Sequence, residues 1–92
     1  MNEQDLVKII NLIEHPEIPL TIKELGVLSY LKIEESIIIV IFALPYLNMP
    51  NRKDIANSVR IMAESFGYKF EYDFRKMNDE ELKKYNLVIK KL

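Results

Sequence analysis

The strongest constraint on the fold of this sequence is an uninterrupted run of eight apolar residues, Ile37–Leu44, many of them β-branched. Such a run is far shorter than the roughly 20 residues that a membrane-spanning helix needs, and its residue types favour a β-strand. Residues 27–33 indicate another strand, and only the polar residues 34–36 separate the two. Because this link is short, we expect the two strands to form an antiparallel hairpin.

A regular alternation of aromatic and charged side chains marks residues 68–75. The aromatic side chains would share one face of a strand and pack on the core, while the charged ones would meet water on the other face. The segment is therefore predicted to be a half-buried third strand. Its aromatic residues are Tyr68, Phe70, Tyr72 and Phe74.

Helical periodicity precedes the hairpin and separates it from the third strand. The first helix is predicted to begin at an N-cap, Asn2, and to end near Glu14, because Pro16 disfavours helical backbone at the residue before it. The second helix is predicted to begin after the N-cap Asn51 and to end at Gly67, where glycine permits the left-handed backbone that closes many helices.

Two shorter segments carry capping patterns. Thr21 and Glu24 have capping-box spacing and indicate one helical turn ahead of the hairpin. Asn78 resembles another N-cap, and the short helix that it starts is predicted to end at residue 84 or 85. Residues 86–92 leave two alternatives open, a short fourth strand and a loose tail.

These elements follow one another as helix, hairpin, helix and strand, with a short C-terminal helix and a fourth strand left open. Two helices packed on one face of a small sheet give a two-layer α/β sandwich of the α+β class. The helix between the second and third strands allows a right-handed crossover, which would set those strands parallel. With 92 residues and no linker or internal repeat, the chain is predicted to be a single domain.

Cysteine content and charge exclude several classes of function. The sequence has no cysteine, which excludes disulfides, thiolate metal sites and cysteine nucleophiles. It has 13 basic and 14 acidic residues, and this net charge of −1 argues against a nucleic-acid partner.

The polar, acidic start does not resemble a signal peptide, so we expect a cytoplasmic protein with no membrane partner. We predict no cofactor, catalytic residue or metal site, because one histidine is weak support for a ligand set of three or four.

The second strand predicts a contact surface, because it carries apolar residues on both faces while helices cover only one. Each large apolar side chain left exposed forgoes about 1.5–3 kcal/mol. Three explanations stay open: the C-terminal segment covers this face, a central strand tolerates the exposure, or a protein partner or second copy binds there. The residues expected to contact a partner are Ile38, Val40 and Phe42 of the strand and Tyr46, Leu47 and Met49 of the loop after it.

His15, Pro16 and Glu17, followed by Leu25 and Gly26 ahead of the hairpin, resemble the motif of a known family. The family pattern is Asp-Pro-Glu and then a Leu-Gly-Leu-Val-like turn, and it is typical of the metal–sulfur (iron–sulfur) cluster assembly family that includes SufT-like and PaaD-like proteins. The resemblance implies that residues 1–92 form one domain similar to the iron–sulfur cluster assembly domain. It also implies an accessory protein that assists cluster delivery to apoproteins or supports multicomponent oxygenases.

The sequence departs from that family where its cysteine stands, in the Thr-Pro-Gly-Cys-Pro segment that follows the second strand. Matching Pro50 to the second family proline sets Met49 at the cysteine position, and matching Pro45 to the first sets Leu47 there. His15 replaces the family's aspartate. Neither Met nor Leu supplies the thiolate that holds an iron–sulfur cluster. The resemblance therefore implies the fold and the partner-binding role, without a cluster held by the chain's own thiolates.

The first hypothesis is a non-enzymatic accessory or adaptor protein that binds a protein partner or a second copy of itself. The alternative is a small enzyme or small-ligand-binding domain that uses His15, Glu17 and the loop of residues 45–50. The helix that begins after this loop offers free N–H groups and a partial positive charge to an anion. A cavity that joins His15 to the loop would favour the alternative, and a flat apolar patch would favour the adaptor.

Overall fold

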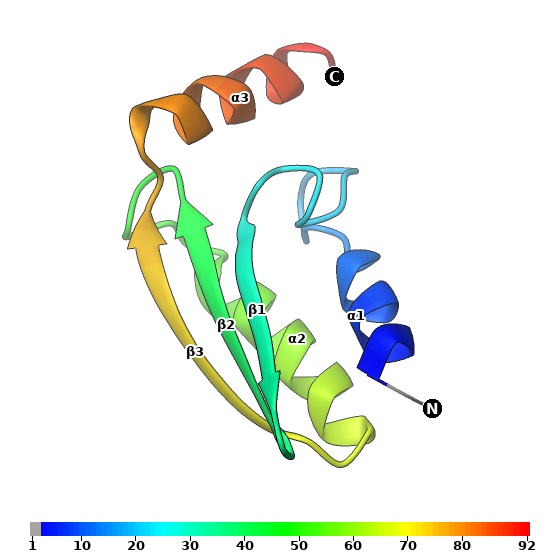
Figure 1. Ribbon diagram of the computed structural model, residues 1–92. Helices are drawn as coiled ribbons and strands as arrows, with labels where there is room; N and C mark the ends of the chain where they lie inside the picture. The colour runs from blue at the N-terminus through cyan, green and yellow to red at the C-terminus, as the bar shows by residue number, and fades with distance from the viewer. Residues whose placement is uncertain (1–2) are drawn as a thin grey trace.

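The computed structural model describes residues 3–92, which form three helices and a three-stranded mixed sheet (Figure 1). This is the predicted α+β architecture. The order along the chain is α1 (Glu3–Asn11), β1 (Leu28–Glu34), β2 (Ile37–Leu44), α2 (Arg52–Ser65), β3 (Lys69–Lys76) and α3 (Asp79–Lys90). None of the helices in the described residues has the length and apolar character to span a membrane.

The sheet has the order β1-β2-β3, with the apolar strand β2 in the centre. β1 and β2 form the expected antiparallel hairpin, and β2 and β3 run parallel, joined by α2. Residues directly opposite each other on neighbouring strands share a face of the sheet. Val40 lies opposite Leu31 and Tyr72, so these side chains share one face, and Ile39 lies opposite Lys32 and Glu71 on the other.

Two helices cover the face that carries Val40. The apolar stripe of α1 and that of α2 join the even-numbered residues of β2 in one core, while α3 lies across the end of the sheet (Figure 1). Ile38, Val40 and Phe42 are fully buried there. Phe42 also meets the aromatic rings of Tyr72 and Phe74, at centroid distances of 6.2 and 5.8 Å. The core members contributed by the two helices are Leu6, Ile10, Ile55, Ala56, Val59 and Ala63.

The first helix ends earlier than predicted, at Asn11 rather than near Glu14. Pro16 favours extended backbone before it, and the chain uses this conformation to pair with the segment that follows. The His15 N–H donates to the Leu20 carbonyl at 2.9 Å, and Glu14 and Thr21 form an antiparallel bridge. The predicted cap at Asn2 lies outside the described residues.

The last helix is longer than predicted, and both alternatives for residues 86–92 are wrong. α3 continues through Lys90 because its apolar residues recur at helical spacing and pack on the core. Its start is the predicted one. The Glu81 N–H donates to the Asn78 side chain at 2.8 Å, and the Asn78 N–H donates to the Glu81 carboxylate at 3.0 Å, which completes a capping box. The apolar residues of α3 that face the core are Leu82, Tyr85, Val88 and Ile89.

Two other capping patterns have mixed outcomes. Thr21 and Glu24 exchange reciprocal hydrogen bonds of 3.0 Å, and the Leu25 N–H donates to the Thr21 carbonyl at 3.1 Å, so the predicted single turn is present. Asn51 does occupy the N-cap position of α2, yet its side chain makes no capping hydrogen bond. Gly26 and Gly67 both adopt positive φ, at 75° and 82°, a conformation that favours glycine over other residues.

Candidate functional site

A cavity of about 200 Å³ opens at the end of the domain where two loops meet α3. One loop follows α1, and the other connects β2 to α2. The sequence singled out both loops, and the structure brings them together. The residues that line the cavity include His15, Glu17, Tyr46, Met49, Asn51 and Tyr85.

His15 is held on the cavity wall by its own turn. The backbone N–H groups of Glu17 and Ile18 donate to His15 Nδ1, at 3.0 and 3.2 Å. Pro16 lies between His15 and Glu17 in the chain and has no N–H to donate. Since Nδ1 is an acceptor, a neutral ring carries its proton on Nε2, and Nε2 is the nitrogen left to meet solvent or a ligand. Only 7% of His15 is exposed.

Burial also sets the charge of this histidine. Burial lowers the pKa of His15 from 6.5, and the nearby Glu17 carboxylate opposes that shift by raising it. The neutral ring therefore dominates at neutral pH. A neutral imidazole with a free Nε2–H can donate one hydrogen bond into the cavity.

The loop between β2 and α2 divides into exposed and buried residues. Tyr46 and Leu47 are 51% and 54% exposed, as a contact surface requires. Met49, predicted to contact a partner, is only 5% exposed and belongs to the core. That prediction is wrong in placing Met49 on the surface, because its side chain closes the core beneath the loop. Pro45 is half-buried and Pro50 is exposed.

The start of α2 borders the cavity at Asn51. Arg52 is the first residue of α2, and its Nη1 donates to the Met49 carbonyl at 2.9 Å. The guanidinium thus holds the loop against the helix. The exposed Lys53, one residue further on, stands at the first turn of α2.

Tyr85 is a cavity residue that the sequence reasoning missed. It comes from α3, where the predicted helix was already ending. Burial raises the pKa of Tyr85, and the proximity of Tyr46 adds to the shift. The spacing of Leu82, Tyr85 and Ile89 by three and four residues was the signal that could have placed Tyr85 on the inner face of a longer helix.

The predicted contact residues of β2 lie on the wrong face of the sheet. Ile38, Val40 and Phe42 are each 0% exposed beneath α1 and α2, so they are not a surface of this chain. The side chains that point away from the helices are those of Ile37, Ile39, Ile41 and Ala43. The three isoleucines are half-buried between their neighbours on β1 and β3. The predicted apolar stripe exists, but on the opposite set of residues.

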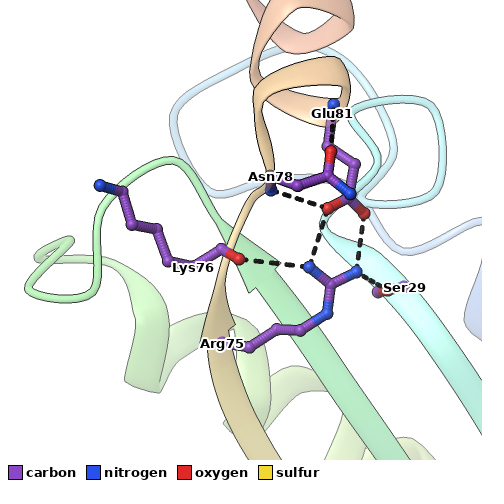
Figure 2. Close-up of polar contacts among 5 residues, drawn as sticks. All are labelled: Ser29, Arg75, Lys76, Asn78 and Glu81. Carbon is purple, nitrogen blue, oxygen red and sulfur yellow. Dashed lines mark hydrogen bonds and ion pairs between the residues drawn. The ribbon is translucent and has the colours of Figure 1, made fainter.

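An arginine on β3 fixes α3 to the end of the sheet (Figure 2). Arg75 donates to both carboxylate oxygens of Glu81, at 2.8 and 2.7 Å, and to the Ser29 hydroxyl at 2.7 Å. Arg75 lies opposite Ala43 on β2, and Ser29 belongs to β1, so the guanidinium crosses the central strand. Ala43 is fully buried, which fits its position under this crossing. The contact holds α3, and with it Tyr85, in place.

The remaining motif positions have local structural roles. Leu25 is 2% exposed and anchors the turn in the core, and Gly26 supplies the positive φ that leads into β1. Pro16 and Glu17 are exposed, and Glu17 lines the cavity. Comparison of the chain with protein-family models and with curated proteins finds no match. The resemblance to the cluster assembly family therefore remains a prediction from the sequence.

The cavity does not fit a metal–sulfur cluster. Within residues 3–92, no three side chains of His, Cys, Asp or Glu gather where they could hold a metal ion. The two residues that can match the family cysteine offer no thiolate, since one is the buried Met49 and the other the exposed Leu47. What the site offers instead is hydrogen-bond donors and an apolar rim, which suit recognition.

Proposed function

We propose that this protein is a non-enzymatic accessory or adaptor protein that acts by binding another protein, in a role like that of the iron–sulfur cluster assembly factors. The observation that carries the proposal is the exposure of Tyr46 and Leu47, at 51% and 54%, beside the cavity that joins the two loops. Because the sequence has no cysteine, this role includes no cluster held by the chain's own thiolates. A cytoplasmic location goes with the proposal.

The size of the cavity supports a protein partner. Sites that enclose a small molecule commonly have about 300–1,000 Å³. A volume of about 200 Å³ suits one side chain of a partner better than a whole metabolite. Tyrosine is enriched among the residues that dominate binding energies, because it offers a large rigid surface and a polar tip. Tyr46 stands at the rim with these properties, and Leu47 extends its apolar surface.

The outer face of the sheet is the second contact surface in this proposal. Ile37, Ile39 and Ile41 are half-buried there and lie outside the core, and neither α1 nor α2 covers them. The two surfaces are separate, since the cavity lies at the end of the domain and the isoleucines lie along the middle of the sheet (Figure 1).

Site-specific photo-crosslinking tests the proposal. A photoreactive amino acid at Leu47 should capture a defined protein in cells that express the chain, because a bound partner would lie within reach of the probe. The matched control places the same probe at Ile61, which is 59% exposed on α2. Crosslinks of the same proteins from both positions, or none from Leu47, would contradict the proposal.

The second candidate function is a small-ligand site, and the residues that line the cavity, rather than its volume, favour it. The cavity joins His15 and Glu17 to the loop of residues 45–50, which is the arrangement that this alternative requires. His15 Nε2–H could donate to a small carboxylate or other acceptor beside the start of α2. Titration with acetate, followed by NMR, should then shift the His15 ring signals and the Asn51 amide signal at millimolar concentration, and His15→Ala should abolish the shift of the Asn51 amide. Ring signals that do not move would exclude this candidate.

A further inference from the structure

The outer face of the sheet carries a charge pattern that is complementary to itself. The strand register places each of the three outward isoleucines between one side chain of β1 and one of β3. In two of these rows the flanking residues have opposite charges, and in the third a tyrosine stands opposite an aspartate. Read from β1 to β3, the rows are Glu34, Ile37 and Lys69; Lys32, Ile39 and Glu71; and Tyr30, Ile41 and Asp73.

The flanking side chains are free to meet a partner. All six are exposed, whereas the isoleucines between them are half-buried. Lys32 and Glu34 form a surface ion pair at 2.5 Å, and each side chain keeps about half of its surface exposed, at 47% and 57%. The face is therefore an apolar stripe between two charged rims, on the side of the sheet opposite α1 and α2 (Figure 1).

We propose that a second copy of this chain covers this face, with the two-fold axis running along β2. A two-fold rotation about this axis keeps the strand direction and the position of each row along the strands, but it exchanges the two edges of the sheet. β1 of one copy therefore lies over β3 of the other, and each row faces the same row of the other copy. Lys32 then faces Glu71 of the partner subunit, and Glu34 faces Lys69 of the partner subunit. The Tyr30 hydroxyl faces Asp73 of the partner subunit as a hydrogen-bond donor. The isoleucines meet in the middle.

The charges favour this arrangement over a two-fold axis that crosses the strands at Ile39. A two-fold axis across the strands at Ile39 would place Lys32 against Lys32 of the partner subunit and Glu71 against Glu71 of the partner subunit. Like charges in register are destabilising, and opposite charges stabilise. The net charge of −1 adds little general repulsion between two copies.

The size of the face predicts a weak dimer. Three strands spaced by about 4.8 Å and eight residues at about 3.3 Å each give a face of about 14 by 26 Å, or about 370 Å². Stable complexes bury about 800 Å² on each partner. The dimer is therefore expected to form at micromolar concentration or above and to dissociate readily.

This inference rests on the proposed function and names the partner that covers the outer face of the sheet. Charge reversal tests the dimer independently of the loop between β2 and α2. Lys32→Glu sets like charges against Glu71 of the partner subunit at two places in each dimer, and Glu71→Lys does so against Lys32 of the partner subunit. Each variant should lose at least about tenfold in self-association. An equimolar mixture of the two should regain wild-type association, because each Lys32→Glu chain then faces a Glu71→Lys chain with opposite charges.

Sedimentation equilibrium from about 10 to 500 µM measures these affinities in the range expected of a weak dimer. The matched control reverses two exposed charges of α3, Glu80→Lys and Lys83→Glu, and should leave association unchanged. Thermal melts confirm that each variant is folded. Lys32→Glu also sets a carboxylate beside Glu34, and Glu34→Lys sets an ammonium beside Lys32, so the thermal melts measure this effect within the chain separately. The swap of Glu34→Lys with Lys69→Glu repeats the association test in the neighbouring row.

Three results would overturn the inference: a wild-type chain that stays monomeric, single reversals that associate like the wild type, or a mixture no better than its components. Single reversals that each lose self-association, with no recovery in the mixture, would indicate a different two-fold axis. Crosslinking from Leu47 is unaffected by any of these results. A monomeric chain that still crosslinks from Leu47 would therefore overturn the dimer alone and leave the proposed function standing.

Discussion

Removing the Arg75 guanidinium should loosen α3 before it unfolds the sheet. Arg75→Met keeps an aliphatic stem over Ala43 and deletes the bonds to Glu81 and Ser29. The side chains of Arg75 and Glu81 are 41% and 28% exposed, so solvent screens the pair, and we assign it about 1 kcal/mol. The bond to Ser29 adds about 0.5 kcal/mol. The expected loss is about 1.5 kcal/mol, or a decrease in Tm of about 6–12 °C for a domain of this size.

Urea denaturation measures the loss in free energy of unfolding, and hydrogen exchange locates it. Amides of α3 should exchange faster in Arg75→Met, while those of β2 should change less. Lys76→Met is the matched control, because the Lys76 side chain is exposed and only its carbonyl contacts Arg75. A loss no larger than that of the control, or unchanged exchange in α3, would refute the role given to Arg75.

Acidity gives the same contact a second test. The hydrogen bonds from Arg75 and then from the Asn78 backbone lower the pKa of Glu81 from 4.5 to about 2. Because the folded pKa lies below the unfolded one, the contact contributes its full stability above about pH 4.5 and loses it as the pH falls towards 2. The difference in stability between wild type and Arg75→Met should therefore shrink over that range. A difference that stays constant from pH 5 to about pH 2 would contradict the assignment.

Three further predictions follow from burial and exposure. Phe42→Ala should lose about 3–5 kcal/mol in urea denaturation and Ile39→Ala clearly less, because only Phe42 is buried under the helices; the reverse order would contradict the assignment of faces. The free energy of unfolding of the wild type should decline between about pH 7 and 5, because His15 takes up a proton more readily in the unfolded chain than in the folded one. His15→Gln should flatten this decline, and an unchanged decline would refute the role given to His15. Leu47→Asp should leave the free energy of unfolding within about 0.5 kcal/mol of wild type and abolish co-purification of the protein captured from that position, and persistent co-purification would count against the loop.

The strands were predictable because their signals are local. The unbroken apolar run predicted both ends of β2 correctly. The alternation of aromatic and charged residues predicted each end of β3 to within one residue. The hairpin followed from the short polar link. The α2 crossover between β2 and β3 allowed the parallel pairing, since such connections are almost always right-handed and return to the same sheet.

The choice of face on β2 was not predictable from β2 alone, because every residue of that strand is apolar. The decision depends on register: Val40 stands opposite Tyr72, and Ile39 opposite Glu71. Only the pairing with β3 tells which alternate residues share the aromatic, helix-covered face. A shift of one residue exchanges the two faces, and without the register the alternate residues Ile38, Val40 and Phe42 were assigned to the wrong face.

The length of α3 and the cavity depend on contacts between distant segments. The C-terminal residues are helical because their apolar side chains pack on the core, and no glycine or proline after Tyr85 ends the helix. The sequence did identify His15, Glu17 and Tyr46 as residues of interest. It did not reveal that Tyr85 completes their surroundings, or that Met49 turns inwards.

Native mass spectrometry of the chain purified from its own host tests most directly whether it works by recognising proteins rather than by chemistry of its own. The account predicts the mass of the bare polypeptide, together with species that contain a second copy or another protein. A stoichiometric metal ion, cluster or small molecule that stays on the isolated chain would contradict it.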